Sequence, residues 1–88
     1  MLADYPNPFN PSTKISYELP EDGFVRIGIY NTLGREIKNL VKKSQNAGQK
    51  IVFWDGTDDT GISVSNGIYF VAMNASSFNE TKKIMLIR

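Results

Sequence analysis

The chain alternates between short stretches of strand-like patterning and clusters of Pro, Gly, Asn and Asp. In residues 13–19, Ile15, Tyr17 and Leu19 alternate with polar side chains, which is the pattern of a strand with one buried face. The stretches with strand character are residues 13–19, 24–30, 35–38, 49–54, 62–64, 67–74 and 80–88. About seven short strands at near-regular spacing predict an all-β fold, an antiparallel β-sandwich of the immunoglobulin or fibronectin type III kind.

Turn-forming residues separate these stretches. Residues 20–23 (Pro-Glu-Asp-Gly) and 31–34 (Asn-Thr-Leu-Gly) are typical turn sequences. The pair Asn66-Gly67 is the strongest hairpin signal, because both central residues of a type I′ turn need a positive φ. The third strand is less regular, because its apolar period slips after Ile37. A β-bulge would explain the slip, and a short helix over residues 36–43 is the alternative; the tight turn before the segment favours the strand.

Composition excludes several classes of function. The chain has 88 residues, of which 41% are hydrophobic, and this corresponds to one globular domain. Its formal net charge is only +1, so a dedicated nucleic-acid binder is not expected. It contains no cysteine and no histidine, which removes the usual catalytic dyads, the common zinc ligands and the near-neutral pH switch. We therefore expect no enzyme activity and no cofactor. No apolar run is long enough for a membrane-spanning helix.

The segment after Trp54 holds the densest acidic cluster, Asp55, Asp58 and Asp59. Carboxylates close together in a loop are candidate calcium ligands. Their spacing does not follow the EF-hand pattern, however, and aspartates commonly shape turns by accepting hydrogen bonds from nearby N–H groups. Adjacent carboxylates on one turn also do not face each other across a sugar ring as a glycosidase pair does. Turn formation is the favoured interpretation, with calcium binding as the minor one.

Aromatic and basic residues supply the remaining candidates. Trp54 is expected to anchor the core between the sheets, because aromatic residues at strand centres of a small sandwich are usually buried. Tyr30 and Phe24, on the polar face of their strand, are better candidates for an exposed contact. Lys82 and Lys83 lie in the last predicted strand, where lysines commonly protect an edge from unwanted pairing. A recognition signal read by a partner is the alternative for this basic strand.

Several motifs in order resemble the type A C-terminal sorting domains of type IX secretion cargo. They are residues 5–11 (Tyr-Pro-Asn-Pro-Phe-Asn-Pro), 31–36 (Asn-Thr-Leu-Gly-Arg-Glu), 46–48 with 54–56 (Asn-Ala-Gly and Trp-Asp-Gly), 67–69 (Gly-Ile-Tyr) and 82–88 (Lys-Lys-Ile-Met-Leu-Ile-Arg). The central stretch is also similar to the immunoglobulin-like domain of flagellar hook-capping proteins. The resemblance covers residues 5–88 and implies one sandwich domain there, with residues 1–4 a linker or an expression remnant.

The sorting-domain resemblance implies a non-catalytic address label. Its partners would be the type IX translocon, a sortase-like peptidase and an upstream cargo domain, and the protein would be exported through the periplasm to the cell surface or medium. An edge-strand dimer is a further expectation, and neither nucleic acid nor membrane insertion is expected. The resemblance maps a recognition signal to Pro6, Asn7, Pro8, Phe9, Gly67, Tyr69, Lys82, Lys83, Leu86 and Arg88. The alternative is an accessory module of an extracellular enzyme that binds carbohydrate or spaces domains.

Overall fold

The computed structural model describes residues 12–76 and 78–87, and all its regular elements are β-strands. The strands are β1 (Thr13–Leu19), β2 (Gly23–Tyr30), β3 (Glu36–Gln45), β4 (Gly48–Trp54), β5 (Gly67–Ala75) and β6 (Phe78–Leu86). Every pairing between them is antiparallel. The prediction of an all-β antiparallel fold is therefore confirmed, with one strand fewer in the described residues than the sequence suggested.

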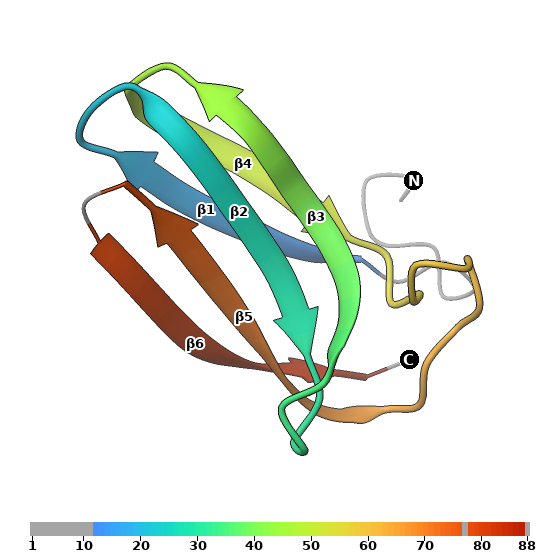
Figure 1. The fold of residues 1–88 in the computed structure, drawn as a ribbon. Coiled ribbons are helices and arrows are strands. Elements are labelled where there is room, and N and C mark those ends of the chain that lie inside the picture. Colours follow the sequence, from blue (N-terminus) through green and yellow to red (C-terminus); the bar gives the residue numbers. More distant parts are fainter. Residues whose placement is uncertain (1–11, 77, 88) are drawn as a thin grey trace, which may run out of the picture.

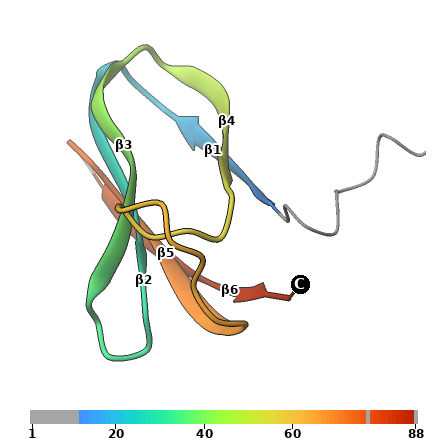
Figure 2. The same cartoon turned by 90° about the vertical axis from the view of Figure 1, so that its right-hand side faces the viewer.

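The six strands form two sheets that face each other (Figures 1 and 2). One sheet has two strands in the order β1-β4, and the other has four in the order β3-β2-β5-β6. The chain therefore crosses between the sheets three times, after β1, after β3 and after β4. The last crossing, over residues 55–66, is the longest connection in the described chain.

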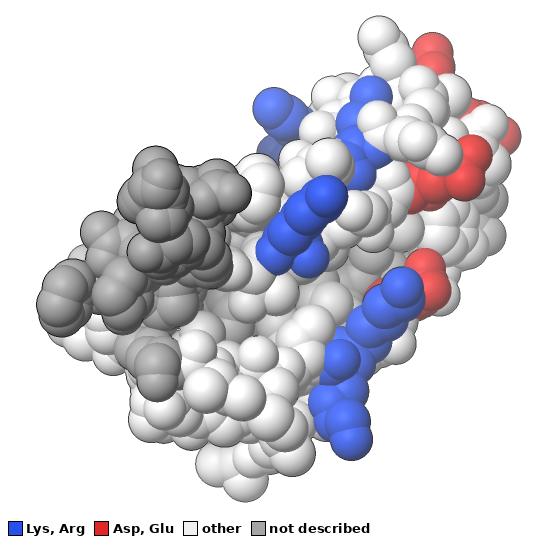
Figure 3. All heavy atoms as spheres, turned by 180° about the vertical axis from the view of Figure 1, so that it is seen from behind, with Lys and Arg blue, Asp and Glu red and all other residues white. Residues whose placement is uncertain are grey.

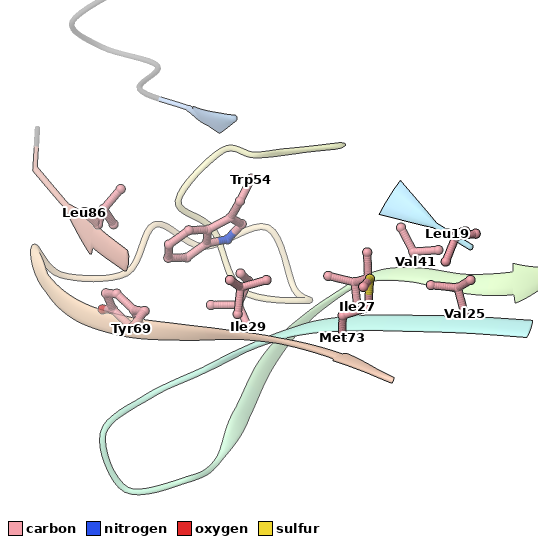
Figure 4. Packing of buried hydrophobic residues seen from close by; sticks show 10 residues of the cluster. Leu19, Val25, Ile27, Ile29, Val41, Trp54, Tyr69, Met73 and Leu86 are labelled. Carbon is pink, nitrogen blue, oxygen red and sulfur yellow. The ribbon is translucent and has the colours of Figure 1, made fainter. Parts of the chain in front are cut away.

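The core lies between the sheets and takes side chains from every strand (Figure 4). Its buried members are mostly the alternate positions of β2 and β5, because successive side chains of a strand point to opposite faces. The buried core residues are Leu19, Val25, Ile27, Ile29, Val41, Trp54, Tyr69, Val71, Met73 and Leu86. A domain without disulfides depends on this cluster for its stability.

The alternation predicted for residues 13–19 is confirmed. Ile15, Tyr17 and Leu19 turn toward the core, whereas the polar residues between them are exposed. Strand β4 packs Val52 and Trp54 inward and leaves Ile51 and Phe53 more than half exposed on the outer face. The smaller sheet thus has one packed face and one face open to solvent.

The irregular third strand is a bulged strand, and the helical alternative is wrong. Its pairing with β2 shifts register between Ile27 and Gly28 and again between Ile29 and Tyr30. Each shift leaves one extra residue on β3, Leu40 and then Ile37, without a partner in the register. Both extra residues are half-buried against the core. A bulge thus lets β3 keep its apolar side chains on one side although their spacing is irregular.

The predicted strand at residues 62–64 and the hairpin turn at Asn66-Gly67 are wrong. Within that segment only Ser63 makes a β-bridge, to Thr57. None of the described residues other than glycine has a positive φ, so Asn66 is not in a type I′ turn. The physical reason is topological: this stretch carries the chain from one sheet to the other, and the local turn preference yields to that path.

We expect Ile27→Ala to lower the free energy of unfolding by about 2–5 kcal/mol, because Ile27 is almost fully buried between the sheets. Ile62→Ala is the matched control, since Ile62 is 65% exposed and its truncation leaves no cavity. Urea unfolding followed by Trp54 fluorescence measures both variants. Equal losses in the two would contradict the assigned core.

Candidate functional site

The connection between β4 and β5 carries the acidic cluster, and we call residues 55–66 the crossing loop. Trp54, the last residue of β4, is fully buried at its start. The indole N–H donates to the carbonyl oxygen of Thr57 at 2.9 Å, and the ring meets Tyr69 edge to face at 5.2 Å. The Tyr69 hydroxyl donates to the carbonyl oxygen of Ser65 at 2.6 Å. Both ends of the crossing loop are therefore fixed to two aromatic core residues.

Two aspartates shape the turns inside the crossing loop. One carboxylate oxygen of Asp55 accepts from the hydroxyl of Thr57 at 2.6 Å and from its backbone N–H at 3.1 Å. Asp58 accepts in the same way from Thr60, at 2.6 and 2.9 Å, and from the N–H of Ile62 at 3.1 Å. These are side-chain-to-backbone turns of the kind that aspartate favours. They require no bound ion.

The third aspartate joins the crossing loop to the edge of β3. The N–H of Asp59 donates to the carbonyl oxygen of Ile37 at 2.9 Å, and its carboxylate accepts from the N–H of Asn39 at 3.0 Å. Lys38, between them, donates through its ammonium to the hydroxyl of Thr57 and the carbonyl oxygen of Asp58, both at 3.2 Å. The crossing loop therefore lies along the bulged edge of β3.

Sequence reasoning missed the role of Lys38. It sits where the strand period slips, so its side-chain direction is not readable from alternation. The slip of the apolar period after Ile37 could have indicated this role, because a bulge turns one side chain away from its regular position.

Hydrogen bonding lowers the pKa of two of the loop carboxyls. The hydroxyl of Thr57 is the largest influence on the pKa of Asp55, and the hydroxyl of Thr60 is the largest on the pKa of Asp58. A donor that bonds the ionised form stabilises it, which is the direction seen in both groups. The charge on the ammonium of Lys38 lowers both pKa values further.

The calcium candidates do not assemble into a cluster. Among residues 12–76 and 78–87, no group of three acidic side chains lies close enough together to hold a metal ion. Asp55, Asp58 and Asp59 each direct an oxygen to protein donors instead. What the arrangement does chemically is to organise a turn.

The candidates for recognition fall into different environments. Gly67 opens β5 with a φ of 149°, and Tyr69 and Leu86 are buried core residues. Lys82 and Lys83 are exposed on β6 and point to opposite faces, because they pair with the buried Val71 and the outward Phe70 respectively. These positions therefore do not form one shared surface: two are buried in the core, and the two lysines lie on opposite faces of β6. Pro6, Asn7, Pro8, Phe9 and Arg88 lie outside the described residues.

The candidates for exposed aromatic contact lie on the outer face of the larger sheet. Phe24 is 49% exposed and Tyr30 is half-buried. An open hollow of about 290 Å³ there is lined by Tyr30 and Phe70, by residues of the turn after β2, and by Ala72 and Thr81. The backbone of that turn is held by Asn31, whose side-chain oxygen accepts from the N–H groups of Leu33 and Arg35, both at 3.0 Å.

On the face drawn in Figure 3, the described charged side chains do not form one dominant patch. Figure 3 shows separate basic side chains along the face behind that of Figure 1, and acidic side chains toward one end. With ten basic and nine acidic residues, the two signs nearly cancel. In the described residues we find no helix with the length and apolar character to cross a bilayer.

The two facing antiparallel sheets define the class of fold, an immunoglobulin-like β-sandwich, and comparison with known proteins identifies the family. A family model described as the FlgD Ig-like domain matches residues 7–78. Because that match covers most of the 88 residues, the chain belongs to the FlgD Ig-like domain family.

Solved structures agree with this assignment. FLGD from P. aeruginosa is similar over 85% of this chain, with a TM-score of 0.67 and 25% sequence identity. The similar region makes up 59% of that FLGD chain, so the present chain corresponds to only part of the length of this relative. No curated protein matches the chain.

These matches correct the functional expectation drawn from sequence. The interpretation as a type IX sorting domain is wrong, because family and structure both match FlgD. The type IX translocon and sortase-like peptidase as partners, and export to the cell surface, are wrong for the same reason. The alternative of an extracellular carbohydrate-binding or spacer module has no support from either comparison. The motifs misled because they include residues with a structural place in the fold: Trp54 and Tyr69 are buried, and Gly67 opens β5. A fold does not fix a function.

Acidification should destabilise the protein through the crossing loop. The pKa values of Asp55 and Asp58 are lowered in the folded state, so their ionisation stabilises it above the unfolded pKa near about 4. This contribution disappears as the pH falls through the folded-state pKa. We expect Asp55→Asn and Asp58→Asn to reduce the loss of stability between about pH 4 and pH 2, measured as urea midpoints.

The control for this pH experiment is Glu18→Gln, which removes one carboxylate from the exposed face of β1, away from the crossing loop. An unchanged pH profile in both aspartate variants would contradict the role assigned to these turns.

Proposed function

We propose that this chain is the immunoglobulin-like module of a FlgD-like flagellar hook-capping protein and that it acts as a non-catalytic structural part of that protein. The observation that carries the proposal is the family match over residues 7–78. The similarity to P. aeruginosa FLGD over most of the chain supports it independently. On this proposal the module's task is mechanical: it supplies a stable body and surfaces within an assembly.

A non-catalytic role fits the chemistry of the described residues. The chain has no histidine or cysteine, so acid–base or nucleophilic work would fall to carboxylates, lysines or hydroxyls. Its densest carboxylate group is in the crossing loop, where each aspartate accepts hydrogen bonds that fix the backbone. Groups that hold a turn in this way are unsuited to exchanging protons with a substrate.

The outer face of the smaller sheet is the surface we assign to contact within such an assembly. Ile51 and Phe53 lie on that face two residues apart on β4, and they are 56% and 59% exposed. Across β1 their pairing partners are Ser16 and Lys14, which are small or flexible enough to leave them accessible. Neighbouring large apolar side chains on an exposed sheet face are typical of contact surfaces.

The proposal can be tested by exchanging domains. We expect a P. aeruginosa FLGD whose immunoglobulin-like region is replaced by this chain to restore hook formation and swimming in a strain that lacks FLGD. The reason is that the two share one fold over 85% of this chain. Hook formation is scored by electron microscopy and swimming in soft agar.

Two controls define the outcome of the exchange. A chimera carrying an unrelated β-sandwich of similar size should fail, and an Ile51→Ser, Phe53→Ser double variant of the active chimera should lower swimming while remaining folded. A stable, exported chimera that makes no hooks would contradict the proposal.

A further inference from the structure

One cross-strand row on the outer face of the larger sheet has opposite charges at its two ends. The register pairs Glu36 of β3 with Tyr30 of β2, and Tyr30 with Phe70 of β5. Phe70 in turn pairs with Lys83 of β6. The two aromatic residues are half-buried and the two charged residues are exposed. The row therefore runs acid, aromatic, aromatic, base across all four strands of this sheet (Figure 1).

The two charges of this row are separated by the width of the sheet. Glu36 and Lys83 lie on the two edge strands, β3 and β6. Neighbouring strands are about 4.8 Å apart, so three spacings place the two Cα atoms about 14 Å apart. A direct ion pair within one chain would need both side chains fully extended across two aromatic residues. Each charge is therefore placed to meet an opposite charge from outside the chain.

Gly28 leaves room for the acidic end of the row. A side chain at position 28 would overlap the carboxylate of Glu36, and its Cβ would lie 3.3 Å from Cε1 of Tyr30. Both side chains therefore lie over this glycine. The hollow of about 290 Å³ that Tyr30, Phe70 and Ala72 help to line lies on the same face. The surface thus has a recess beside the aromatic pair.

Two further apolar side chains extend this face. Ile68 and Met85 pair with each other, two residues along their strands from Phe70 and Lys83. They are 39% and 57% exposed. Exposed apolar side chains that gather in this way mark a contact surface, and the charges at its margin select the partner.

We propose that this face is the interface of a two-fold dimer of the chain, in which the row of one copy lies against the same row of the second copy in reverse order. A two-fold axis parallel to the strands, midway between the two facing sheets, exchanges the two ends of the row. Glu36 then meets Lys83 of the second copy, and Tyr30 meets its Phe70. Each contact is made twice, as in any isologous interface. The row is complementary to itself, which identifies a second copy as its occupant.

This interface is separate from the outer face of the smaller sheet and does not depend on a flagellar role, so it can be measured on the 88-residue chain alone. The four-stranded face covers at most about 500 Å² per copy, from strand spacing and rise per residue. Stable interfaces bury about 800 Å² per partner, so we expect a weak dimer with a Kd on the order of 0.1 mM. Sedimentation equilibrium between about 0.01 and 1 mM should show reversible dimerisation.

Charge reversal tests the reversed order of the two rows. Glu36→Lys puts like charges opposite each other at both ends of the interface, so we expect association to weaken about tenfold or more. Lys83→Glu should have the same effect. An equimolar mixture of the two variants should regain the association of the unchanged chain, because every end contact then joins a lysine to a glutamate.

The matched controls are Glu18→Lys and Lys14→Glu, which make the same changes of net charge on the exposed side of β1 in the smaller sheet. Each should leave association within about twofold of the unchanged chain. Urea midpoints equal to that of the unchanged chain establish that the variants are folded. In a sample that mixes isotope-labelled and unlabelled chains, nuclear Overhauser contacts should join Tyr30 of one copy to Phe70 of the other.

Three results would overturn the proposal. The first is a chain that stays monomeric at about 1 mM. The second is a dimer that responds to the reversals at Glu18 and Lys14 as strongly as to those at Glu36 and Lys83, which would place the interface on the smaller sheet. The third is a mixture of Glu36→Lys and Lys83→Glu that associates no better than either variant alone.

Discussion

The buried indole of Trp54 is the contact on which the arrangement of this small domain depends. The ring has no exposed surface and packs edge to face on Tyr69, which joins the last residue of the smaller sheet to a central strand of the larger one (Figure 4). Its N–H is satisfied by the carbonyl oxygen of Thr57, so burial costs no unpaired polar group. The crossing loop begins from this fixed point. One side chain therefore both bridges the two sheets and fixes the start of the path between them.

Three residues of the motifs that suggested a sorting domain have structural roles in this fold. Trp54 and Tyr69 are buried core residues and Gly67 opens β5, so these positions serve the fold, and a fold does not fix a function. This is why motifs in the right order suggested a secretion signal, whereas the family match over residues 7–78 places the chain with FlgD. The surface that we propose for contact within an assembly is instead an exposed face, that of Ile51 and Phe53 on β4.

Much of the fold was predictable from local pattern. The alternation in residues 13–19 has one physical cause, burial of one face, and it predicted β1 with its correct bounds. The slip after Ile37 correctly indicated a bulge. The turn at Asn66-Gly67 failed because a favourable local sequence was overridden by the need to cross between sheets. The roles of Asp59 and Lys38 depend on contacts about 20 residues apart in the chain, and no local pattern reports such contacts.

The attachment of the crossing loop to β3 has a consequence for how the protein avoids aggregation. β3 is an edge strand, and the bonds from Asp59 to Ile37 and Asn39 occupy backbone groups that another chain would otherwise pair with. That protection exists only after β4 has formed and the chain has turned back from Trp54. While the protein emerges from a ribosome, β2 and β3 can pair before residue 59 has been synthesised, and the edge is bare during that interval. From Gln45, the end of β3, the chain must grow by 14 residues to reach Asp59. The time needed for this, on the order of a second or more, is an interval in which this edge can pair with the wrong strand.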